Sequence, residues 1–307
     1  MIHVRPFLNH DPPAIANVIN TCCNLEAVVS TNLLEFAVFA KTYFRRDHLF
    51  VATIAEELLG FVHLGSASQE DLQTGTLTIS NFLVSNSDMA IAKALLDYTL
   101  AYAETRGIKC LRIGTPPDKA EYYNGISTHF LNVGVPQTHP ILPILETLGF
   151  KTIDSWHCLQ FDIHNGQIPF TRKQMSLRRT HVLDQLTDPD FKDHLLNSVY
   201  SHLATSQLDL THRQTGETEA SITFACLAQS YPNWPNGGVD IIRYTSRTDL
   251  DLSHYEFLLC EILRQLPQTG LSPLRLHVDA KDTQRMEIAE AIGFERIITS
   301  SHVEYLI

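Results

Sequence analysis

A short polar turn followed by a long helical segment is the stretch of this sequence best suited to bind an anionic group. Residues 85–88 read Ser-Asn-Ser-Asp and lie between an apolar run and an amphipathic segment. The first N–H groups of a helix have no partner inside the helix, and the helix dipole adds to their attraction for phosphates. We therefore expect a ligand site at this turn.

The motifs of several other kinds of chemistry do not occur. The 15 histidines form no HExxH pattern and no Cys/His cluster with metal-ligand spacing, and no loop has the carboxylate spacing of a calcium site. The sequence also has no GxSxG elbow and no P-loop. We therefore expect no bound metal, and we expect neither a serine hydrolase with a GxSxG elbow nor a P-loop NTPase.

The turn is held between two strands by a helix that is easy to predict. Ile91, Leu95, Tyr98 and Tyr102 share one face of a helix, and Gly107 is the expected left-handed stop. The apolar runs on either side are too short for helices. Strand, helix and strand in about 35 residues form a right-handed crossover, which makes the two strands parallel. Such sheets often bind ligands where a strand ends and the next helix begins.

Composition limits the class of protein. A length of 307 residues favours two domains, and 44% hydrophobic with 19% charged residues is ordinary for a soluble protein. The formal net charge of −11 argues against nucleic acid or an anionic membrane as the main partner, since both require clustered Lys and Arg. No window is apolar enough for a membrane span or a signal peptide. Most of the six cysteines lie inside apolar patterns, which is typical of reduced thiols, so we expect a cytoplasmic protein.

A weak internal repeat organises the chain. Leu-Gly-Phe at 148–150 and Ile-Gly-Phe at 292–294 are 144 positions apart (293 minus 149), and each follows a short helical segment behind a strand. A polar segment with Gly and Pro at 164–173 separates the copies. The sequence therefore predicts two domains, 1–165 and 166–307.

Local patterns predict further strands. Residues 49–55 and 58–64 are expected to form a hairpin. Residues 152–156 and 158–163 are interpreted as a second hairpin, and 177–183 as a strand. An aromatic loop at 231–238 is interpreted as either a packed loop or one wall of a pocket.

These features together resemble the GNAT acyltransferase superfamily, and the duplication resembles its tandem members. Arg5-Pro6-Phe7 resembles the usual opening of the fold, and Phe82 to Leu95 resembles the acyl-CoA pyrophosphate segment. The helix followed by Gly-Phe, found twice, resembles the segment that closes the substrate side. The resemblance implies an α/β protein with two GNAT-like domains, each a mixed, mostly antiparallel sheet flanked by helices.

The resemblance also implies acetyl-CoA, or another acyl-CoA, as a co-substrate held by the N-terminal domain. Pantetheine would lie between two splayed strands and pair with the backbone of the first, while the pyrophosphate would sit at the helix start. The matching residues are Phe82, Leu83, Val84, Ser87, Asp88, Met89, Ala90, Ile91 and Ala92.

The sequence departs from the family at this segment. Ala90 and Ala92 stand where the family has glycines, and no Arg or Gln stands at the loop. Asp88 would compete with phosphate for the helix N–H groups, or would simply cap the helix. In the second copy, Asp282 occupies the place of an Asn that steadies pantetheine, and it too is a candidate helix cap.

The tyrosine acid that is common in the family is replaced in both copies, by Leu145 and by Ala289. Substitutes stand in or after the irregular segment beyond Gly114. Tyr123 is the preferred acid, and His139 the preferred base, because an imidazole titrates near neutral pH.

Two functions remain open. The leading one is an acyl-CoA-dependent N-acyltransferase, with acetyl transfer to a small-molecule amine. The second is a degenerate tandem protein that binds a ligand or a partner without catalysis. The missing glycines, Asp88 and the replaced tyrosines favour the second function.

Overall fold

The computed structural model describes residues 1–23, 28–65, 73–119, 121–126, 131, 133–163, 166–227, 237–247 and 252–307. The chain divides into two compact units. Unit 1 contains Met1–Ser155, Asp193–His202 and Ser300–Ile307, and unit 2 contains Trp156–Lys192 and Leu203–Thr299.

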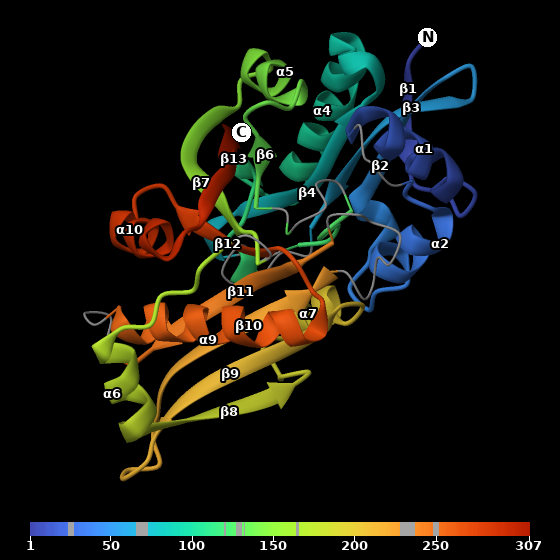
Figure 1. Cartoon of the computed structure of the whole chain (residues 1–307). Helices are drawn as coiled ribbons and strands as arrows, with labels where there is room; N and C mark the ends of the chain where they lie inside the picture. Colours follow the sequence, from blue (N-terminus) through green and yellow to red (C-terminus); the bar gives the residue numbers. More distant parts are fainter. Residues whose placement is uncertain are drawn as a thin grey trace. The chain divides into compact units, whose positions relative to one another are not determined.

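Unit 1 is built on a twisted sheet with the order β1-β2-β3-β4-β5-β13 (Figure 1). Only β4 and β5 pair in parallel among these strands, and the short β6 pairs with β13. The strands are β1 (His3–Pro6), β2 (Leu49–Ile54), β3 (Glu57–Leu64), β4 (Thr76–Val84), β5 (Cys110–Ile113), β6 (Val135–Pro136) and the part of β13 (Glu295–Leu306) that begins at Ser300.

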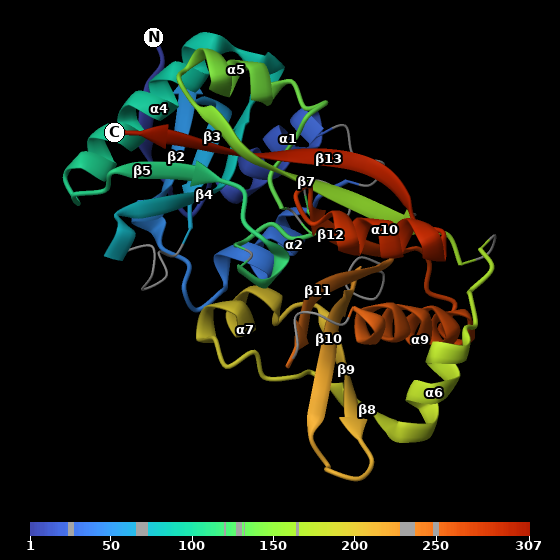
Figure 2. The ribbon, with the colours of Figure 1, turned by 90° about the vertical axis from the view of Figure 1, so that its left-hand side faces the viewer.

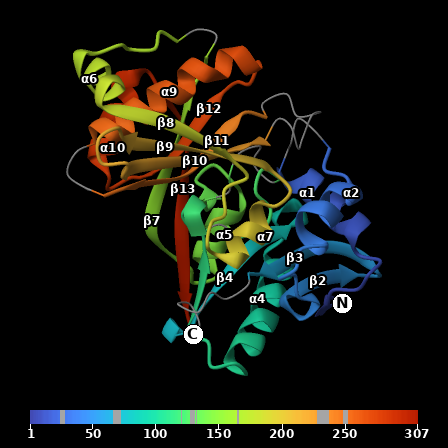
Figure 3. The ribbon, with the colours of Figure 1, turned by 90° about the horizontal axis from the view of Figure 1, so that it is seen from below.

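Helices cover both faces of this sheet. In Figure 3, α1 and α4 lie on opposite sides of β2 and β3. The α-helices are α1 (Pro12–Cys23), α2 (Thr31–Leu34), α4 (Met89–Glu104), α5 (Ile141–Thr147) and α7 (His194–Tyr200). The short helical turns are a π-helical turn, η1 (Glu35–Phe39), and the 3-10 turns η2 (Arg46–His48), η3 (Ser85–Ser87) and η4 (Pro117–Lys119).

The crossover predicted from the sequence is present. Ile91 and Leu95 of α4 are buried in one core with Phe50 and Val62 of the sheet, as their helical spacing requires. The helix ends at Glu104, and Gly107 has a φ of +69°, the left-handed conformation that the stop signal predicts. Residue packing of this face thus fixes the end of β4 against the start of α4.

Unit 2 has the sheet order β7-β12-β11-β10-β9-β8, with β11 and β12 in parallel (Figure 1). The strands are β7 (Lys151–Phe161, from Trp156), β8 (His181–Thr187), β9 (Ala204–His212), β10 (Thr218–Cys226), β11 (Val239–Ser246), β12 (Leu274–Asp279) and the first residues of β13. The helices are α6 (Arg172–Thr180), α9 (Ser253–Thr269) and α10 (Thr283–Ile292), and α9 buries its apolar face on β9 and β10.

Two local predictions are wrong. Residues 152–163 form no hairpin, because β7 is one continuous strand from Lys151 to Phe161. His157, which lies between the two expected strands, pairs opposite Val278, and its Nδ1 lies 2.9 Å from Thr299 Oγ1. A partner for the imidazole lets this polar residue stay inside the strand.

The strand predicted at 177–183 is mostly helix. Helix α6 starts at the N-cap Thr171 and ends at Thr180, and only then does β8 begin. Its side chains are held by α9: Arg178 makes a bidentate ion pair with Glu261, at 2.8 and 3.0 Å. These contacts link residues more than eighty positions apart and override a weak local pattern.

The predicted domains, 1–165 and 166–307, are contiguous halves, and residue 165 lies outside the described residues. Each compact unit instead takes segments from both halves: Asp193–His202 and Ser300–Ile307 belong to unit 1. The duplication boundary therefore stays a prediction. The aromatic loop at 231–238 falls mostly outside the described residues.

Within the part of the chain that the structure describes, no helix combines the length and the apolar character needed to cross a bilayer. All six cysteines are free thiols.

Candidate functional site

Strands β4 and β5 of unit 1 separate halfway along β4. Their parallel register runs from Thr76 opposite Cys110 to Ile79 opposite Ile113 and then stops, while β4 continues to Val84. Figure 2 shows β4 and β5 side by side in unit 1. The second half of β4 keeps its pairing with β3, so its other edge presents N–H and C=O groups that β5 does not bind.

A bulge marks the point of separation. His63 of β3 pairs with Asn81, and the next residue, Leu64, pairs with Ile79, so Ser80 is an extra residue in β4. A bulge bends a strand and re-aims its side chains, and such bulges are common next to active sites. Ser80 is 6% exposed, and within the described residues its Oγ has no hydrogen-bond partner. This hydroxyl is therefore available to a ligand.

A cleft opens where the strands separate. It encloses about 450 Å³, part of it open to solvent. Its walls are mainly apolar and come from α1, β4, β5, β6 and α5; the lining residues are Cys23, Ser80, Asn81, Phe82, Leu83, Ile113, Gly134, Val135, Pro136, His139, Ile141 and Leu145. Two of the predicted cofactor residues, Phe82 and Leu83, therefore border it.

Gly134 is required in the wall of this cleft. Its φ is +157°, and a Cβ there would lie 2.7 Å from the carbonyl oxygen of Ser301. A side chain at this position would clash with backbone. The glycine thus allows the chain in the cleft wall to pass close to the backbone of β13.

The start of α4 lies at the end of β4, and its N–H groups are bonded by the protein itself. The carboxylate of Asp88 accepts hydrogen bonds from the N–H groups of Ala90, at 2.8 Å, and Ile91, at 3.2 Å. The N–H of Ala92 donates to the backbone oxygen of Asp88. Asp88 is therefore the N-cap of α4, and a phosphate at this turn would have to displace its side chain.

The other predicted residues of the segment divide into two groups. Val84, Ile91 and Ala92 are buried in the core, so only their backbone could face a ligand. Ser87, Met89 and Ala90 are not buried. Asn86 and Ser87 both have positive φ, 55° and 53°, so the turn adopts a left-handed conformation without glycine.

His139 lies in the cleft wall at the start of α5. Its Nδ1 accepts a hydrogen bond from the N–H of Ile141, at 3.1 Å, and burial lowers its pKa. In the neutral ring the proton then resides on Nε2. His139 is thus arranged to donate a hydrogen bond through Nε2, while the nitrogen that a base needs is already used.

Tyr123 is placed differently from His139. It is 1% exposed and has a φ of +69°, and its hydroxyl lies 3.1 Å from Nδ1 of His63. Burial raises its pKa well above the usual value for tyrosine. The residues that line the cleft and the chamber beside it do not include Tyr123. Its predicted role as an acid stays a prediction.

A second, smaller chamber of about 270 Å³ shares Ser80, Ile113 and Gly134 with the cleft. Glu121 and Tyr122 line it, and Glu121 is 8% exposed. A Cβ at Gly65 would lie 2.6 Å from both Glu121 carboxylate oxygens, so the glycine makes room for the carboxylate. The chamber therefore adjoins the separation point of β4 and β5 and is lined by a buried carboxyl group.

Sequence reasoning missed Ser80 and Glu121. Ser80 and Asn81 are two adjacent polar residues between the apolar Ile79 and Phe82, which was a usable signal. Glu121 precedes Tyr122 and Tyr123 in an irregular segment, where no periodicity marks it.

Cys23 in the cleft wall is poorly suited to act as a nucleophile at neutral pH. Burial raises the pKa of its thiol to about 12, so the thiolate is scarce. A covalent acyl-cysteine intermediate at this residue is therefore disfavoured.

Unit 2 also contains two parallel strands that pair over only part of their length, but a buried ion pair lies between them. The parallel pairing of β11 and β12 covers only Val239 with Leu274 and Asp240 with Arg275. Asp240 and Arg275 are 0% and 2% exposed and form an ion pair at 2.7 Å. Asp282 caps α10 by accepting from the N–H of Arg285, at 3.0 Å.

No family model and no curated protein matches the chain. Solved structures do match. One is a GCN5-related glucosamine N-acetyltransferase region of a fungal multi-domain GH3 β-N-acetylglucosaminidase, with 12% identity and a TM-score of 0.71 over 99% of this chain. The chain spans only 38% of that protein.

Two further structures match along nearly their whole length. A tandem GNAT protein from the clavulanic acid biosynthesis pathway has 11% identity and a TM-score of 0.70, covering 100% of this chain and 98% of its own. A GCN5-related N-acetyltransferase from Sphaerobacter thermophilus has 11% identity and a TM-score of 0.66, covering 99% and 95%. The chain therefore has the tandem fold of the GCN5-related N-acetyltransferases.

Proposed function

We propose that the protein is an acyl-CoA-dependent N-acyltransferase that acetylates a small-molecule amine, with the acyl-CoA bound in unit 1. The observation that carries the proposal is the separation of β4 from β5 beyond Ile79, at a point that borders a mainly apolar cleft. An extended chain of amides, such as pantetheine, can add to such an edge as an extra strand.

The residues of the cleft suit the pantetheine arm better than the phosphates. The β4 backbone and the Ser80 hydroxyl supply hydrogen bonds, and Phe82 and Leu83 supply apolar contact. The pyrophosphate would lie at the start of α4, where Asp88 now bonds the N–H groups. We infer that this carboxylate swings away when acyl-CoA binds.

Acetyl transfer in this cleft would be direct. The amine nitrogen attacks the thioester carbonyl carbon, the C–N bond forms, and the C–S bond breaks as the CoA thiolate leaves. Backbone N–H groups at the β4 edge and Nε2–H of His139 are the donors available to the oxygen and sulfur that gain negative charge. The high pKa of Cys23 agrees with a route that has no acyl-enzyme.

Glu121 is our candidate for the base, in place of the base role first expected for His139. Its carboxylate lines the chamber that adjoins the cleft, and a carboxylate there attracts an amine that arrives as an ammonium ion. Tyr122 adds an aromatic face to the same chamber. These features favour a small cationic amine as acceptor.

The proposed location is the cytoplasm, where acyl-CoA is available and where free thiols such as those of this chain persist.

A release assay tests the proposal. Free CoA thiol is measured with acetyl-CoA and a panel of primary amines; glucosamine belongs in the panel because the fungal region is described as a glucosamine N-acetyltransferase. We expect acetyl transfer to at least one amine. Glu121→Gln should lower kcat by about 100-fold or more, while the Kd of acetyl-CoA stays unchanged.

Glu104→Gln, an exposed position at the end of α4, is the matched control and should retain full activity. Acetyl-CoA binding without turnover on any amine would instead support the non-catalytic alternative.

A further inference from the structure

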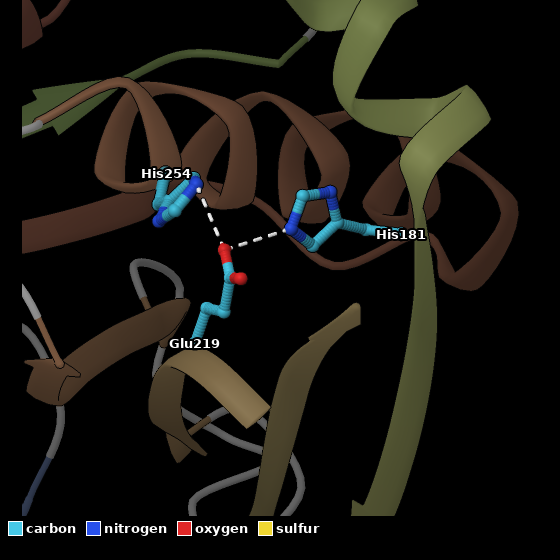
Figure 4. Close-up of side chains that lie close together, drawn as sticks. All are labelled: His181, Glu219 and His254. Carbon is cyan, nitrogen blue, oxygen red and sulfur yellow. Dashed lines mark hydrogen bonds and ion pairs between the residues drawn. The ribbon is translucent and has the colours of Figure 1, made fainter. Parts of the chain in front are cut away.

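Three side chains from three separate elements of unit 2 converge on one oxygen atom. Nε2 of His181, the first residue of β8, lies 2.9 Å from Oε2 of Glu219 in β10. Nε2 of His254, in the first turn of α9, lies 3.7 Å from the same oxygen. Figure 4 shows both interactions ending at one oxygen of Glu219. The ligand atoms all lie within 4.8 Å of one another.

Local backbone features aim these groups at each other. In the pairing of β10 with β9, Thr218 is opposite Thr211 and Ala220 is opposite Leu210, so Glu219 is the extra residue of a bulge. The bulge turns Glu219 toward α9, where it meets His254. A charged side chain is thereby directed against a helix that covers an apolar core.

The cluster is mostly shielded from water. His181 and His254 are 6% and 9% exposed, and the Glu219 side chain is 32% exposed. A third imidazole, that of His212, lies directly opposite His181 in β9, with ring centroids 5.1 Å apart. Several imidazole nitrogens around one carboxylate provide a set of possible metal ligands, which a simple ion pair on the surface does not.

The hydrogen bonds around His181 indicate which of its two ring nitrogens carries the proton in the neutral form. Thr180 Oγ1 lies within hydrogen-bond distance of the α6 carbonyl oxygens of Ser176 and Leu177, at 3.1 and 3.3 Å, so its single proton is directed there. It then accepts from Nδ1–H of His181, at 2.8 Å. In the neutral tautomer with its proton on Nδ1, the Nε2 lone pair can bind a cation that Glu219 also ligates.

We propose that His181, Glu219 and His254 bind a divalent zinc ion. Two imidazole nitrogens with one carboxylate oxygen form a ligand set that zinc uses and that magnesium and calcium, which prefer oxygen, do not. Ligand atoms about 2.0–2.1 Å from a tetrahedral zinc lie about 3.3–3.4 Å apart. The separations of 2.9 and 3.7 Å from Oε2 lie on either side of that value.

This site departs from the sequence expectation of no metal, because its ligands are 38 and 35 residues apart (219 minus 181, 254 minus 219) and match no short motif. Its position indicates its role. Zinc would link the first residue of edge strand β8 to β10 and to the first turn of α9, and so stabilise this end of the unit 2 sheet. Three protein ligands leave a fourth position for water or for His212.

Zinc binding to the full chain, after treatment with a chelator and gel filtration, tests the site. Calorimetry with zinc chloride should show one tight site per chain. Co²⁺ in its place should give the visible absorption of a tetrahedral complex. Glu219→Gln keeps the shape of the side chain and a group that can hydrogen-bond His181, but it removes the charged ligand, so zinc affinity should fall at least about tenfold.

Glu217→Gln is the matched control. Glu217 lies two residues before Glu219 in the sequence, but its exposed side chain pairs with Arg247. This variant should bind zinc like the parent protein. Zinc should also raise the unfolding temperature of the parent and of this control, but not of Glu219→Gln. His254→Gln serves as a second ligand variant, with circular dichroism to confirm folding.

Two results would overturn the inference. One is the lack of stoichiometric zinc binding in the parent chain, which would leave a hydrogen bond from Nε2–H of His181 to Glu219 as the whole interaction. The other is zinc binding that persists unchanged in both Glu219→Gln and His254→Gln, which would place the ion on other histidines.

Discussion

Asp88 should restrain acyl-CoA binding, and replacing it should strengthen that binding. Its carboxylate bonds the N–H groups of Ala90 and Ile91, which a pyrophosphate at the start of α4 would need. Bound acyl-CoA must therefore break these two hydrogen bonds and tolerate a nearby negative charge. Asp88→Asn removes the charge and keeps an equally good cap.

The size of the effect follows from the distance. A unit charge about 6 Å from Asp88 costs about 0.7 kcal/mol in water, and a pyrophosphate with two charges costs about 1.4 kcal/mol. Salt screens part of this repulsion at an exposed residue. Asp88→Asn should thus tighten acetyl-CoA binding by about 3- to 10-fold.

Calorimetry with two ligands isolates the cause. Acetyl-CoA contains the pyrophosphate, whereas S-acetylpantetheine has the same thioester arm without it. Asp88→Asn should strengthen binding of the first and leave the Kd of the second unchanged. Asp88→Ala should also cost about 1 kcal/mol of unfolding free energy through loss of the cap, measured by urea denaturation.

The reasoning would be refuted if Asp88→Asn left the acetyl-CoA Kd within about twofold of the parent value, or if it changed the affinity for both ligands equally. Weaker binding would show that the carboxylate assists the ligand, since the cap is kept in this variant.

Two further predictions concern stability. His63 and His202 are buried, and burial lowers the pKa of each to about 3, so between about pH 6.5 and 3 the unfolded chain binds protons that the folded chain does not. Unfolding free energy should fall by about 1.3 kcal/mol per histidine from about pH 7 to pH 5.5, measured by urea titrations; a pH-independent value would contradict this. In unit 2, Asp240→Ala leaves the Arg275 guanidinium buried without its carboxylate and should cost about 3–5 kcal/mol, whereas replacing both residues by apolar ones of similar volume should cost much less. Equal losses in the single and double variants would show that packing, not charge, dominates.

The sequence predicts the crossover of unit 1 well because its signals are local. The apolar face of α4, the cap at Asp88 and the stop at Gly107 each depend on residues within a few positions of one another. The sequence also predicts that Asp88 either caps α4 or competes with phosphate for its N–H groups, because a carboxylate before a helix has only a few N–H groups within reach.

Elements held by distant contacts were not predictable in the same way. Helix α6 depends on partners such as Glu261, and β7 remains continuous at His157 because Thr299 supplies a partner. In the candidate site, the bulge at Ser80 exists only as a mismatch between two strands, and Glu121 acquires meaning only where the chain folds back past Gly65. A single sequence shows none of these pairings.

Acetyl-CoA binding by the parent chain tests the central claim most directly. Calorimetry should give one site per chain, and Ser80→Leu, which fills the point where β4 and β5 separate, should weaken binding by at least about tenfold. Ser206→Leu on β9 of unit 2 should leave it unchanged. No heat and no thermal shift at millimolar acetyl-CoA, or binding that Ser80→Leu does not affect, would contradict an acyl-CoA site between these strands.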